Sequence, residues 1–353
     1  MILGTRLAAT AATLTAIAVT ATACGTTKVD GPAAGGSTAP SSQSCADDKT
    51  TTSTGPVSLT DGVGRKVELA KPAQRVAVLE WQQTEDLLTL CLTPVAVADT
   101  KGYSTYVKAE ALPQGVVDTG QRGEPDLDAL YAAKPDLIIV DAFKPDDEQI
   151  AKLEKRGVPV LATVGADASG QLANMKKVFS MIGQATGRTE RADLVLKQFD
   201  EHLAAAKKTV EAADVKATDF LFFDGWIEGG NVVIRPYGKG ALFTELGQQL
   251  GLTPAWTDKI NTAYGSGGVD PSYGLAQTDI EGLTAVGSAS LFYSDDATPD
   301  SYVKELRKSP IWTALPAVKE GRAYAFPAGV WGAGGPKSNE AAIDAYVKIL
   351  TGK

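Results

Sequence analysis

Short apolar segments alternate with short helical segments along the first half of the chain, and this alternation limits the possible fold more than any other feature. The predicted strands are bounded by proline, glycine or charged residues, and the predicted helices carry apolar residues at helical spacing. The predicted strands are 75–79, 94–98, 137–140 and 158–164. The predicted helices between them are 84–90, 127–133 and 147–156. This order predicts a parallel, doubly wound α/β sheet.

After Gly170 the pattern changes to longer helices, one predicted at 172–184 and a second that begins at the turn 187–189 and runs to about Ala213. The second of these has roughly 24 residues, a length of about 36 Å that is enough to cross a domain. A second series of strands and helices follows, at 219–223, 231–235, 242–250, 278–286, 290–293, 302–307, 322–326 and 338–350. A chain of 353 residues also exceeds what one hydrophobic core usually serves, so two lobes are expected.

An internal correspondence supports two lobes of the same kind. Asp126-Leu-Asp-Ala-Leu130 and the strand after it match Asp279-Ile-Glu-Gly-Leu283 and its following strand at a constant offset of 153 residues. We therefore predict an α/β protein of two doubly wound lobes with mainly parallel sheets. One long α-helix would join the lobes, and a ligand cleft would lie between them.

The N-terminus has the features of a leader sequence. Residues 1–23 contain one charge, Arg6, followed by an apolar stretch at 7–19 that is too short for a comfortable membrane span. The small residues before Cys24 resemble a bacterial lipobox, in which Cys24 would be diacylated and become the first mature residue. Ordinary secretory cleavage with an incidental cysteine is the alternative.

The residues that follow Cys24 are mainly Gly, Ser, Thr, Ala and Pro, a composition that predicts a flexible tether. Lipid and tether together predict a protein held at the extracytoplasmic face of the cell membrane. The predicted boundaries are 1–23 for the signal peptide, 24–56 for the lipidated tether, 57–170 for the N-terminal lobe, 171–214 for the helical segment with the inter-lobe helix, and 215–353 for the C-terminal lobe.

The remaining two cysteines, Cys45 and Cys91, are expected to form a disulfide, because disulfides persist outside the cytoplasm. Such a bridge would fix the end of the tether to the first lobe. Two independent thiols, with Cys91 buried at the end of a helix, are the alternative.

Charge and histidine content exclude several functions. The net charge is −8 and the sequence pI is about 4.9, with no basic block, which argues against a nucleic-acid partner. The single histidine, His202, lies in the long predicted helix and is expected to be solvated. A histidine-built metal site and a Ser-His-Asp triad are therefore not expected, and no cysteine pair has metal-ligand spacing.

Aromatic and arginine side chains stand at predicted loop positions, mostly after strands. In open α/β sheets the carboxyl ends of the strands face the ligand crevice. Aromatic rings offer a large contact area, and arginine can bind anionic oxygen atoms. The candidate ligand-binding residues are Trp81, Tyr103, Tyr106, Arg122, Trp226, Arg235, Tyr237, Tyr264, Tyr273 and Trp331.

Two motifs resemble one family. Gly120-Gln-Arg-Gly-Glu-Pro-Asp-Leu-Asp128 followed by Ala133-Lys-Pro-Asp-Leu-Ile-Ile139 is similar to the signature of the helix-linked periplasmic binding proteins for ferric siderophores and cobalamin. The segments 80–90, 93–98 and 331–336 resemble the iron-siderophore branch found in Gram-positive lipoproteins, and the resemblance covers about residues 57–352. It implies a monomeric receptor of an ABC importer that delivers a ferric siderophore to a permease. No cofactor is implied, because the iron is carried within the siderophore.

The resemblance also implies roles for single residues. Arg122 matches a cleft arginine that, in the ferric hydroxamate-binding member, contacts the iron-bound oxygens; a tyrosine of that member falls near Phe143 and is missing here. Asp128 and Glu281 match acidic residues, one on each lobe, that pair with permease arginines. Carboxylates in the first turn of a helix also stabilise its dipole, which is the alternative role.

Several ligands remain possible at this point. Neutral or cationic ferric hydroxamates suit a cleft with many aromatic residues and few cations, whereas a ferric tris-catecholate would require several Arg or Lys. Cobalamin or haem binding by the same fold is the alternative, although haem usually takes an axial His or Tyr. A surface-tethered hydrolase is less favoured, because no nucleophile and base are recognisable, so we predict that the protein is not an enzyme.

Overall fold

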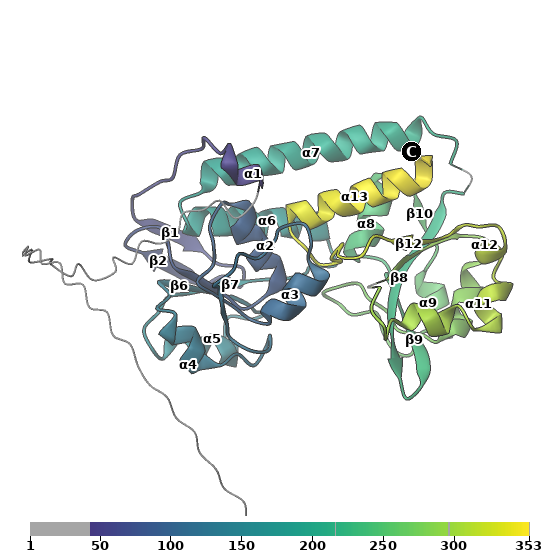
Figure 1. Cartoon of the computed structure of the whole chain (residues 1–353), viewed down its shortest axis with the longest axis horizontal. Coiled ribbons are helices and arrows are strands. Elements are labelled where there is room, and N and C mark those ends of the chain that lie inside the picture. The colour runs from purple at the N-terminus through teal and green to yellow at the C-terminus, as the bar shows by residue number, and fades with distance from the viewer. Residues whose placement is uncertain (1–42, 216, 296, 353) are drawn as a thin grey trace, which may run out of the picture. The chain divides into compact units, whose positions relative to one another are not determined.

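The computed structural model describes residues 43–215, 217–295 and 297–352, which form two α/β lobes (Figure 1). The predicted signal peptide and Cys24 lie outside the described residues. None of the described helices is both long enough and apolar enough to span a bilayer.

The N-terminal lobe contains a parallel sheet of five strands in the order β5-β4-β3-β6-β7. The strands are β3 (Val76–Val78), β4 (Ala96–Val97), β5 (Val117–Asp118), β6 (Leu137–Asp141) and β7 (Val160–Thr163). The two central strands are buried on both faces, which explains their continuous apolar sequences. Val76 and Val78 point into one hydrophobic cluster, and Ala77 points into the cluster on the opposite face.

Helices cover both faces of this sheet. One face packs on α2 (Trp81–Thr89), on α6 (Gln171–Ala185) and on the start of α7 (Thr189–Glu211), and the other packs on α4 (Leu127–Ala132) and α5 (Glu148–Glu154). An antiparallel hairpin, β1 (Val57–Thr60) with β2 (Lys66–Leu69), and helix α3 (Thr100–Tyr106) complete the lobe. The prediction of a doubly wound sheet is confirmed, whereas the hairpin, α3 and the short edge strand β5 were not predicted.

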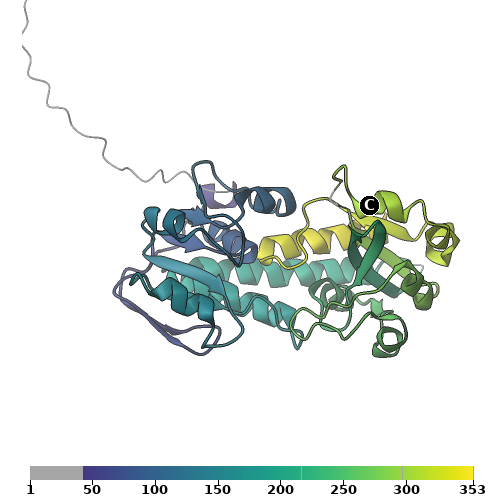
Figure 2. The same cartoon turned by 90° about the horizontal axis from the view of Figure 1, so that it is seen from below.

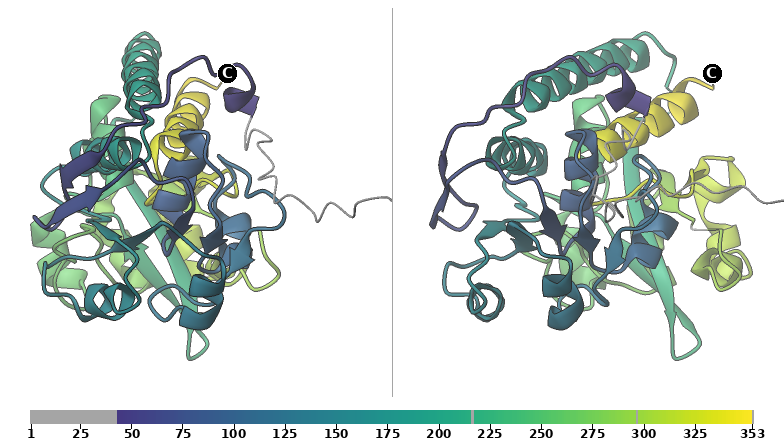
Figure 3. Two further views of the ribbon diagram at one scale, coloured as in Figure 1. Left: turned by 90° about the vertical axis from the view of Figure 1, so that its left-hand side faces the viewer. Right: turned by 60° about the vertical axis from the view of Figure 1, so that its left-hand side comes forward.

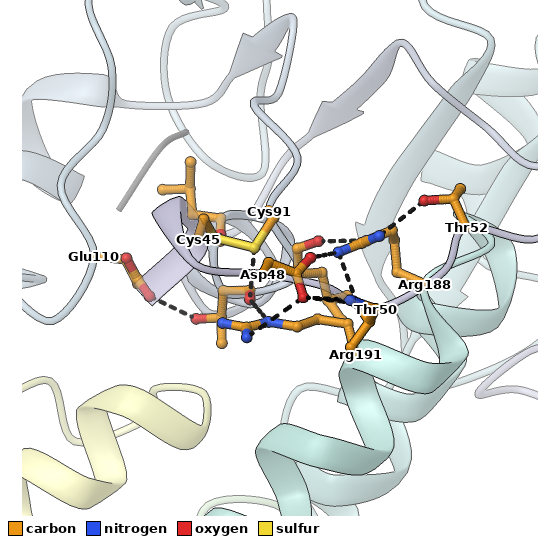
Figure 4. Close-up of a disulfide and its surroundings, with 11 residues drawn as sticks. Cys45, Asp48, Thr50, Thr52, Cys91, Glu110, Arg188 and Arg191 are labelled. Atoms are coloured by element: carbon orange, nitrogen blue, oxygen red, sulfur yellow. Dashed lines mark hydrogen bonds and ion pairs between the residues drawn. A yellow bond between two sulfur atoms is a disulfide. The ribbon is translucent and has the colours of Figure 1, made fainter. Parts of the chain in front are cut away.

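The segment before the hairpin is attached to the lobe rather than free of it. The expected disulfide joins Cys45, in the short helix α1 (Gln43–Ala46), to Cys91, with the two Cα atoms 5.5 Å apart (Figure 4). Asp48 is ion-paired with Arg188 and lies 3.9 Å from Arg191 at the start of α7. The globular body therefore includes residues that their composition assigned to the tether.

The C-terminal lobe has a sheet in the order β10-β8-β11-β12, all parallel, with β9 antiparallel to β8. The strands are β8 (Asp219–Glu228), β9 (Asn231–Pro236), β10 (Thr253–Pro254), β11 (Ser290–Ser294) and β12 (Ala323–Phe326). The helices are α8 (Leu242–Gln249), α9 (Asp258–Tyr264), the 3-10 helix η1 (Ile280–Val286), α10 (Tyr302–Leu306), α11 (Pro310–Ala314), α12 (Pro316–Lys319) and α13 (Pro336–Thr351).

The internal correspondence is confirmed by the structure. Helix α4 and strand β6 begin at residues 127 and 137, and η1 and β11 begin at 280 and 290, which is the same offset of 153. Strand β6 pairs with β3, the first strand of its sheet, and β11 pairs in the same way with β8. The second copy differs in having a 3-10 helix in place of an α-helix.

More than one helix holds the lobes together. Helix α7 places Val195 in the N-terminal core and Val210 in the C-terminal core, as expected of an inter-lobe helix. Helix α6 also contributes to both cores, through Leu172 at its start and Ile182 near its end, which was not predicted. Helices α7 and α13 run side by side on the same side of both sheets (Figures 1, 2 and 3).

Candidate functional site

Two adjoining cavities lie where the strand order of each sheet reverses, which is the usual ligand position in open α/β sheets. The first has a volume of about 270 Å³ and is lined by the last residue of β6 and by residues that follow β3 and β7 of the N-terminal lobe. The second has a volume of about 410 Å³ and receives residues from β8 and from the segment after β11 in the C-terminal lobe. Arg122, Arg235, Tyr237, Trp331 and Gly332 line both, so the two cavities form one cleft between the lobes.

Two carboxylates stand at the strand ends in the first cavity. Glu80 follows β3 and accepts a hydrogen bond of 2.9 Å from Nη1 of Arg122. Burial raises the pKa of Glu80, although the positive charge of Arg122 acts in the opposite direction. Asp141 ends β6 and accepts a hydrogen bond of 2.6 Å from the backbone N–H of Gly165. Burial raises the pKa of Asp141 to about 7, and the neighbouring charge of Glu80 adds to this.

The N-terminal lobe provides an aromatic wall. Trp81 begins α2, and its ring centroid lies 5.7 Å from that of Tyr106 and 5.0 Å from that of Trp331. The guanidinium of Arg122 lies 3.9 Å from the Trp81 ring centroid, a cation–π distance. Arg122 is therefore held by the ring and by Glu80 together, with 35% of its side chain still exposed.

The C-terminal lobe provides the second arginine. Arg235 on β9 faces Asp224 directly across the β8–β9 hairpin, and the pair is bidentate, with Nε at 2.7 Å from Oδ1 and Nη2 at 2.5 Å from Oδ2. The hydroxyl of Tyr237 donates to the same carboxylate at 3.2 Å. A Cβ at Gly332 would lie 2.5 Å from that hydroxyl, so a side chain there would displace Tyr237 from the cleft.

Eight of the ten predicted ligand-binding residues line this cleft. They are Trp81, Tyr106, Arg122, Trp226, Arg235, Tyr237, Tyr273 and Trp331. The other two expectations need correction. Tyr103 is fully buried and donates a hydrogen bond of 2.8 Å to the backbone carbonyl of Glu110, because the inner face of α3 packs against α2. Tyr264 ends α9, is 46% exposed and lines neither cavity.

The sequence-based prediction was limited to aromatic residues and arginines, and it did not include the other polar residues that line the cleft. Those missed are Glu80, Gln82, Gln83, Asp141, Gln171, Asp224, Ser294, Asp295, Asp300, Ser301 and Tyr302. Glu80 and Asp141 follow predicted strands directly, which is the same positional signal that identified Trp81. Phe143, at the position of the missing tyrosine, is 51% exposed, and its ring centroid lies 6.4 Å from that of Tyr273 on the other lobe.

The two predicted docking residues are exposed, one on each lobe. The side chain of Asp128 on α4 is 88% exposed and accepts a hydrogen bond of 2.8 Å from Arg156. Glu281 is exposed on η1. His202 lies outside the cleft, with Nε2 at 2.8 Å from Oδ1 of Asp344 on α13.

The charges that line the cleft are mostly negative. Five carboxylates and two guanidiniums line the two cavities, a formal charge of −3 when all are ionised. No lysine lines either cavity within the described part of the chain. Among those residues there is also no group of three or more His, Cys, Asp or Glu placed to hold a metal ion.

Comparisons with known proteins agree with this architecture. The family model described as "Periplasmic binding protein" matches residues 76–329. The Iron(3+)-hydroxamate-binding protein FhuD of Escherichia coli (strain K12) is 27% identical over 258 residues, covering 73% of this chain and 80% of that protein. The Fe(3+) dicitrate-binding periplasmic protein FecB of the same strain is 26% identical over 266 residues, covering 74% of this chain and 80% of that protein.

Among solved structures, the Fe3+–Desferal-bound siderophore-binding protein FhuD from Vibrio cholerae superposes with a TM-score of 0.66 at 23% identity. The match covers 79% of this chain and 98% of the other. The resemblance predicted from the motifs at 120–139 is thereby confirmed. The chain belongs to the periplasmic binding protein family.

Proposed function

We propose that this protein is the solute-binding lipoprotein of an ABC importer, and that it binds a ferric siderophore of the hydroxamate type. The observation that carries the proposal is the composition of the cleft. Both lobes contribute an arginine that lies close to a tryptophan ring, Arg122 with Trp81 and Arg235 with Trp226. Such a site offers hydrogen-bond donors for the iron-bound oxygens and aromatic surface for the organic part of the ligand.

The charge of the cleft favours a hydroxamate over an anionic complex. Sequence identity does not distinguish between these ligands, because the relatives named for hydroxamate and for citrate are 27% and 26% identical to this chain. A ferric tris-catecholate carries three negative charges and would meet two arginines that are already paired with Glu80 and Asp224. Asp295 and Asp300 would then repel it, whereas a neutral or cationic ferric hydroxamate avoids this cost.

Iron needs no protein ligand in this proposal, because the siderophore fills the coordination shell of the metal. Haem is less suitable, since His202 pairs with Asp344 outside the cleft. Burial also raises the pKa of Tyr273 in the cleft, which disfavours the phenolate that would ligate a haem iron. The role is therefore binding and delivery rather than catalysis.

Delivery rests on features at other positions. Residues 1–23 are proposed as a signal peptide and Cys24 as the lipidated residue, which would hold a monomer at the extracytoplasmic face of the membrane. Asp128 and Glu281 are proposed to contact arginines of the permease, and their exposure on separate lobes supports this.

Tryptophan fluorescence tests the proposal directly, since three of the five tryptophans, Trp81, Trp226 and Trp331, line the cleft. The ligands are Fe3+–Desferal, a ferric tris-catecholate, ferric citrate, cobalamin and haem, with iron-free Desferal as control. We expect saturable quenching by Fe3+–Desferal with a Kd below about 10 μM, a binding free energy of roughly 7 kcal/mol. Tighter binding of the catecholate would contradict the hydroxamate assignment, and absence of binding by every ferric siderophore would contradict the transport role.

A further inference from the structure

The second cavity is a distinct compartment of the cleft with its own chemistry. It lies at the point in the C-terminal lobe where β8 and β11 pair side by side, and residues of β8 and β9 line it. Strands β8 and β9 form the long hairpin seen in Figure 1. By the internal correspondence, this position is the counterpart of the Glu80 and Asp141 crevice in the N-terminal lobe. Its volume of about 410 Å³ exceeds the 270 Å³ of the first cavity, so a ligand confined to the first would leave it unfilled.

The carboxylates of this cavity are not all neutralised. Asp224 is fully engaged by Arg235, but Asp295 and Asp300 are not. Oδ1 of Asp295 accepts hydrogen bonds from the Ser301 hydroxyl at 2.9 Å and from the backbone N–H of residue 297 at 3.0 Å. Its Oδ2 has only a guanidinium, that of Arg307, at 4.0 Å among the described residues, beyond hydrogen-bond distance.

Asp300 is exposed and forms no ion pair within the described part of the chain. Arg307 itself is 56% exposed and does not line the cavity, so water screens its charge. The two arginines that line this cavity, Arg122 and Arg235, are already paired with Glu80 and Asp224. Asp295 and Asp300 thus face the cavity with no cation within hydrogen-bond distance among the described residues.

Aromatic side chains from both lobes form a large part of the cavity wall. Trp81 and Tyr106 line it from the N-terminal lobe, and Trp226 and Tyr302 line it from the C-terminal lobe. The Tyr302 hydroxyl donates to the carbonyl of Ser294 at 2.8 Å, which fixes its ring beside Asp295. Low-polarity walls strengthen the attraction between a carboxylate and a cation, and ring faces add cation–π attraction.

We propose that the second cavity is a subsite for a cationic substituent of the ferric ligand, a protonated amine or guanidinium, held by Asp295 and Asp300. This inference rests on the proposed function. The iron–hydroxamate core would occupy the first cavity beside Arg122 and Arg235, which line both compartments, and the cationic arm would extend into the second. The preferred substrate class is therefore a ferric hydroxamate with a positively charged arm.

A matched pair of ligands tests the inference. Fe3+–Desferal carries a terminal ammonium group, and its N-acetyl derivative has the same iron shell without that charge. We expect the unmodified protein to bind the charged ligand about tenfold more tightly, an effect of the size that two partly exposed charge pairs give. The preference should shrink as salt is raised, because screening weakens the contact.

Three variants locate the effect. Asp300→Asn and Asp295→Asn should each reduce the preference, and the double variant should abolish it while leaving affinity for the N-acetyl ligand unchanged. Asn at 295 retains an acceptor for Ser301, and Asp300 is exposed, so folding is expected to be preserved. Asp193→Asn, which removes an exposed carboxylate on α7 outside both cavities, is the matched control and should keep the full preference.

The affinities for the two ligands distinguish failure of the subsite from failure of the proposed function. Equal affinity of the unmodified protein for both ligands would overturn the subsite and leave the proposed function standing. A preference for the charged ligand that persists in the double variant would overturn the assignment to Asp295 and Asp300. An equal loss of affinity for both ligands in that variant would overturn it as well. Failure of both ligands to bind the unmodified protein would instead refute the proposed function.

Discussion

Glu85→Gln should remove a large part of the pH dependence of stability. Glu85 lies fully buried on α2, and its carboxyl accepts a hydrogen bond of 2.8 Å from the backbone N–H of Ser338 in the first turn of α13. It thereby caps a helix of the other lobe, which has no side-chain cap of its own. A Cβ at Gly335 would lie 2.1 Å from Oδ1 of Asp86, so glycine permits this close approach of α2 and α13.

The sign and size of the pH dependence that Glu85 gives to the free energy of unfolding follow from its burial. Burial raises the pKa of Glu85 from 4.5 to about 7, against the hydrogen bonds from Ser338 and with added repulsion from Glu110. Between these pH values the folded protein keeps a proton that the unfolded chain has released, so stability falls as pH rises from about 4.5 to about 7. A shift of this size corresponds to roughly 3 kcal/mol. Gln at this position can accept the backbone hydrogen bond and does not titrate.

Urea denaturation at several pH values between 4.5 and 8 measures the effect. The unmodified protein should lose about 3 kcal/mol of its free energy of unfolding through Glu85 as the pH rises across this range, and the variant should not. The free energy of unfolding of the variant minus that of the unmodified protein should therefore increase by the same amount. Asp128→Asn, which changes an 88% exposed carboxylate, is the control and should give a nearly constant difference. A difference for Glu85→Gln that is equally constant would refute the assignment of a buried, protonated carboxyl.

Other predictions concern binding, delivery and stability. Arg122→Ala should weaken Fe3+–Desferal binding by about 1.5–3 kcal/mol in fluorescence titrations, because charge-assisted hydrogen bonds are lost; an unchanged Kd would remove Arg122 from the site. The double variant Asp128→Ala/Glu281→Ala should bind within about 0.5 kcal/mol of the unmodified protein and yet lose uptake into cells; undiminished uptake would rule out the docking role. Replacing Cys45 and Cys91 by serine should lower the free energy of unfolding by roughly 2–4 kcal/mol, and equal denaturation midpoints at unchanged slope would contradict this. Ligand binding should change the radius of gyration in solution scattering only slightly, because helices shared by both cores resist bending; a large compaction would contradict shared cores.

Local patterns sufficed for most strands of the two parallel sheets and for the repeat, but not for the hairpin β1–β2 or the two-residue strands β5 and β10. The segment 137–140 is apolar without alternation because β6 is buried on both faces, so a central parallel strand could be predicted from it. The offset of 153 needed only a few matching residues, since both copies place a capping aspartate, Asp126 or Asp279, before the helix.

Contacts distant in sequence could not be predicted in this way. Tyr103 and Tyr106 lie three residues apart on one short helix, yet one is fully buried and the other is 37% exposed. Tyr103 packs against Leu88 and Val107, whereas Tyr106, at the end of the helix, stacks on Trp81 and lines the cleft. Nothing near Glu85 in the sequence indicates that it caps a helix 253 residues later. The pairing of Asp224 with Arg235 depends on the register of a hairpin whose strand β8 extends five residues beyond its predicted end at 223.

The position of the iron tests the central claim most directly. Crystals of the protein grown with Fe3+–Desferal would locate the metal by anomalous diffraction at the iron absorption edge. We expect one strong peak in the cleft beside Arg122 and Arg235, with hydroxamate oxygens filling the coordination shell. A peak outside the cleft, or iron ligated by side chains of the protein itself, would contradict the binding of an intact ferric siderophore between the lobes.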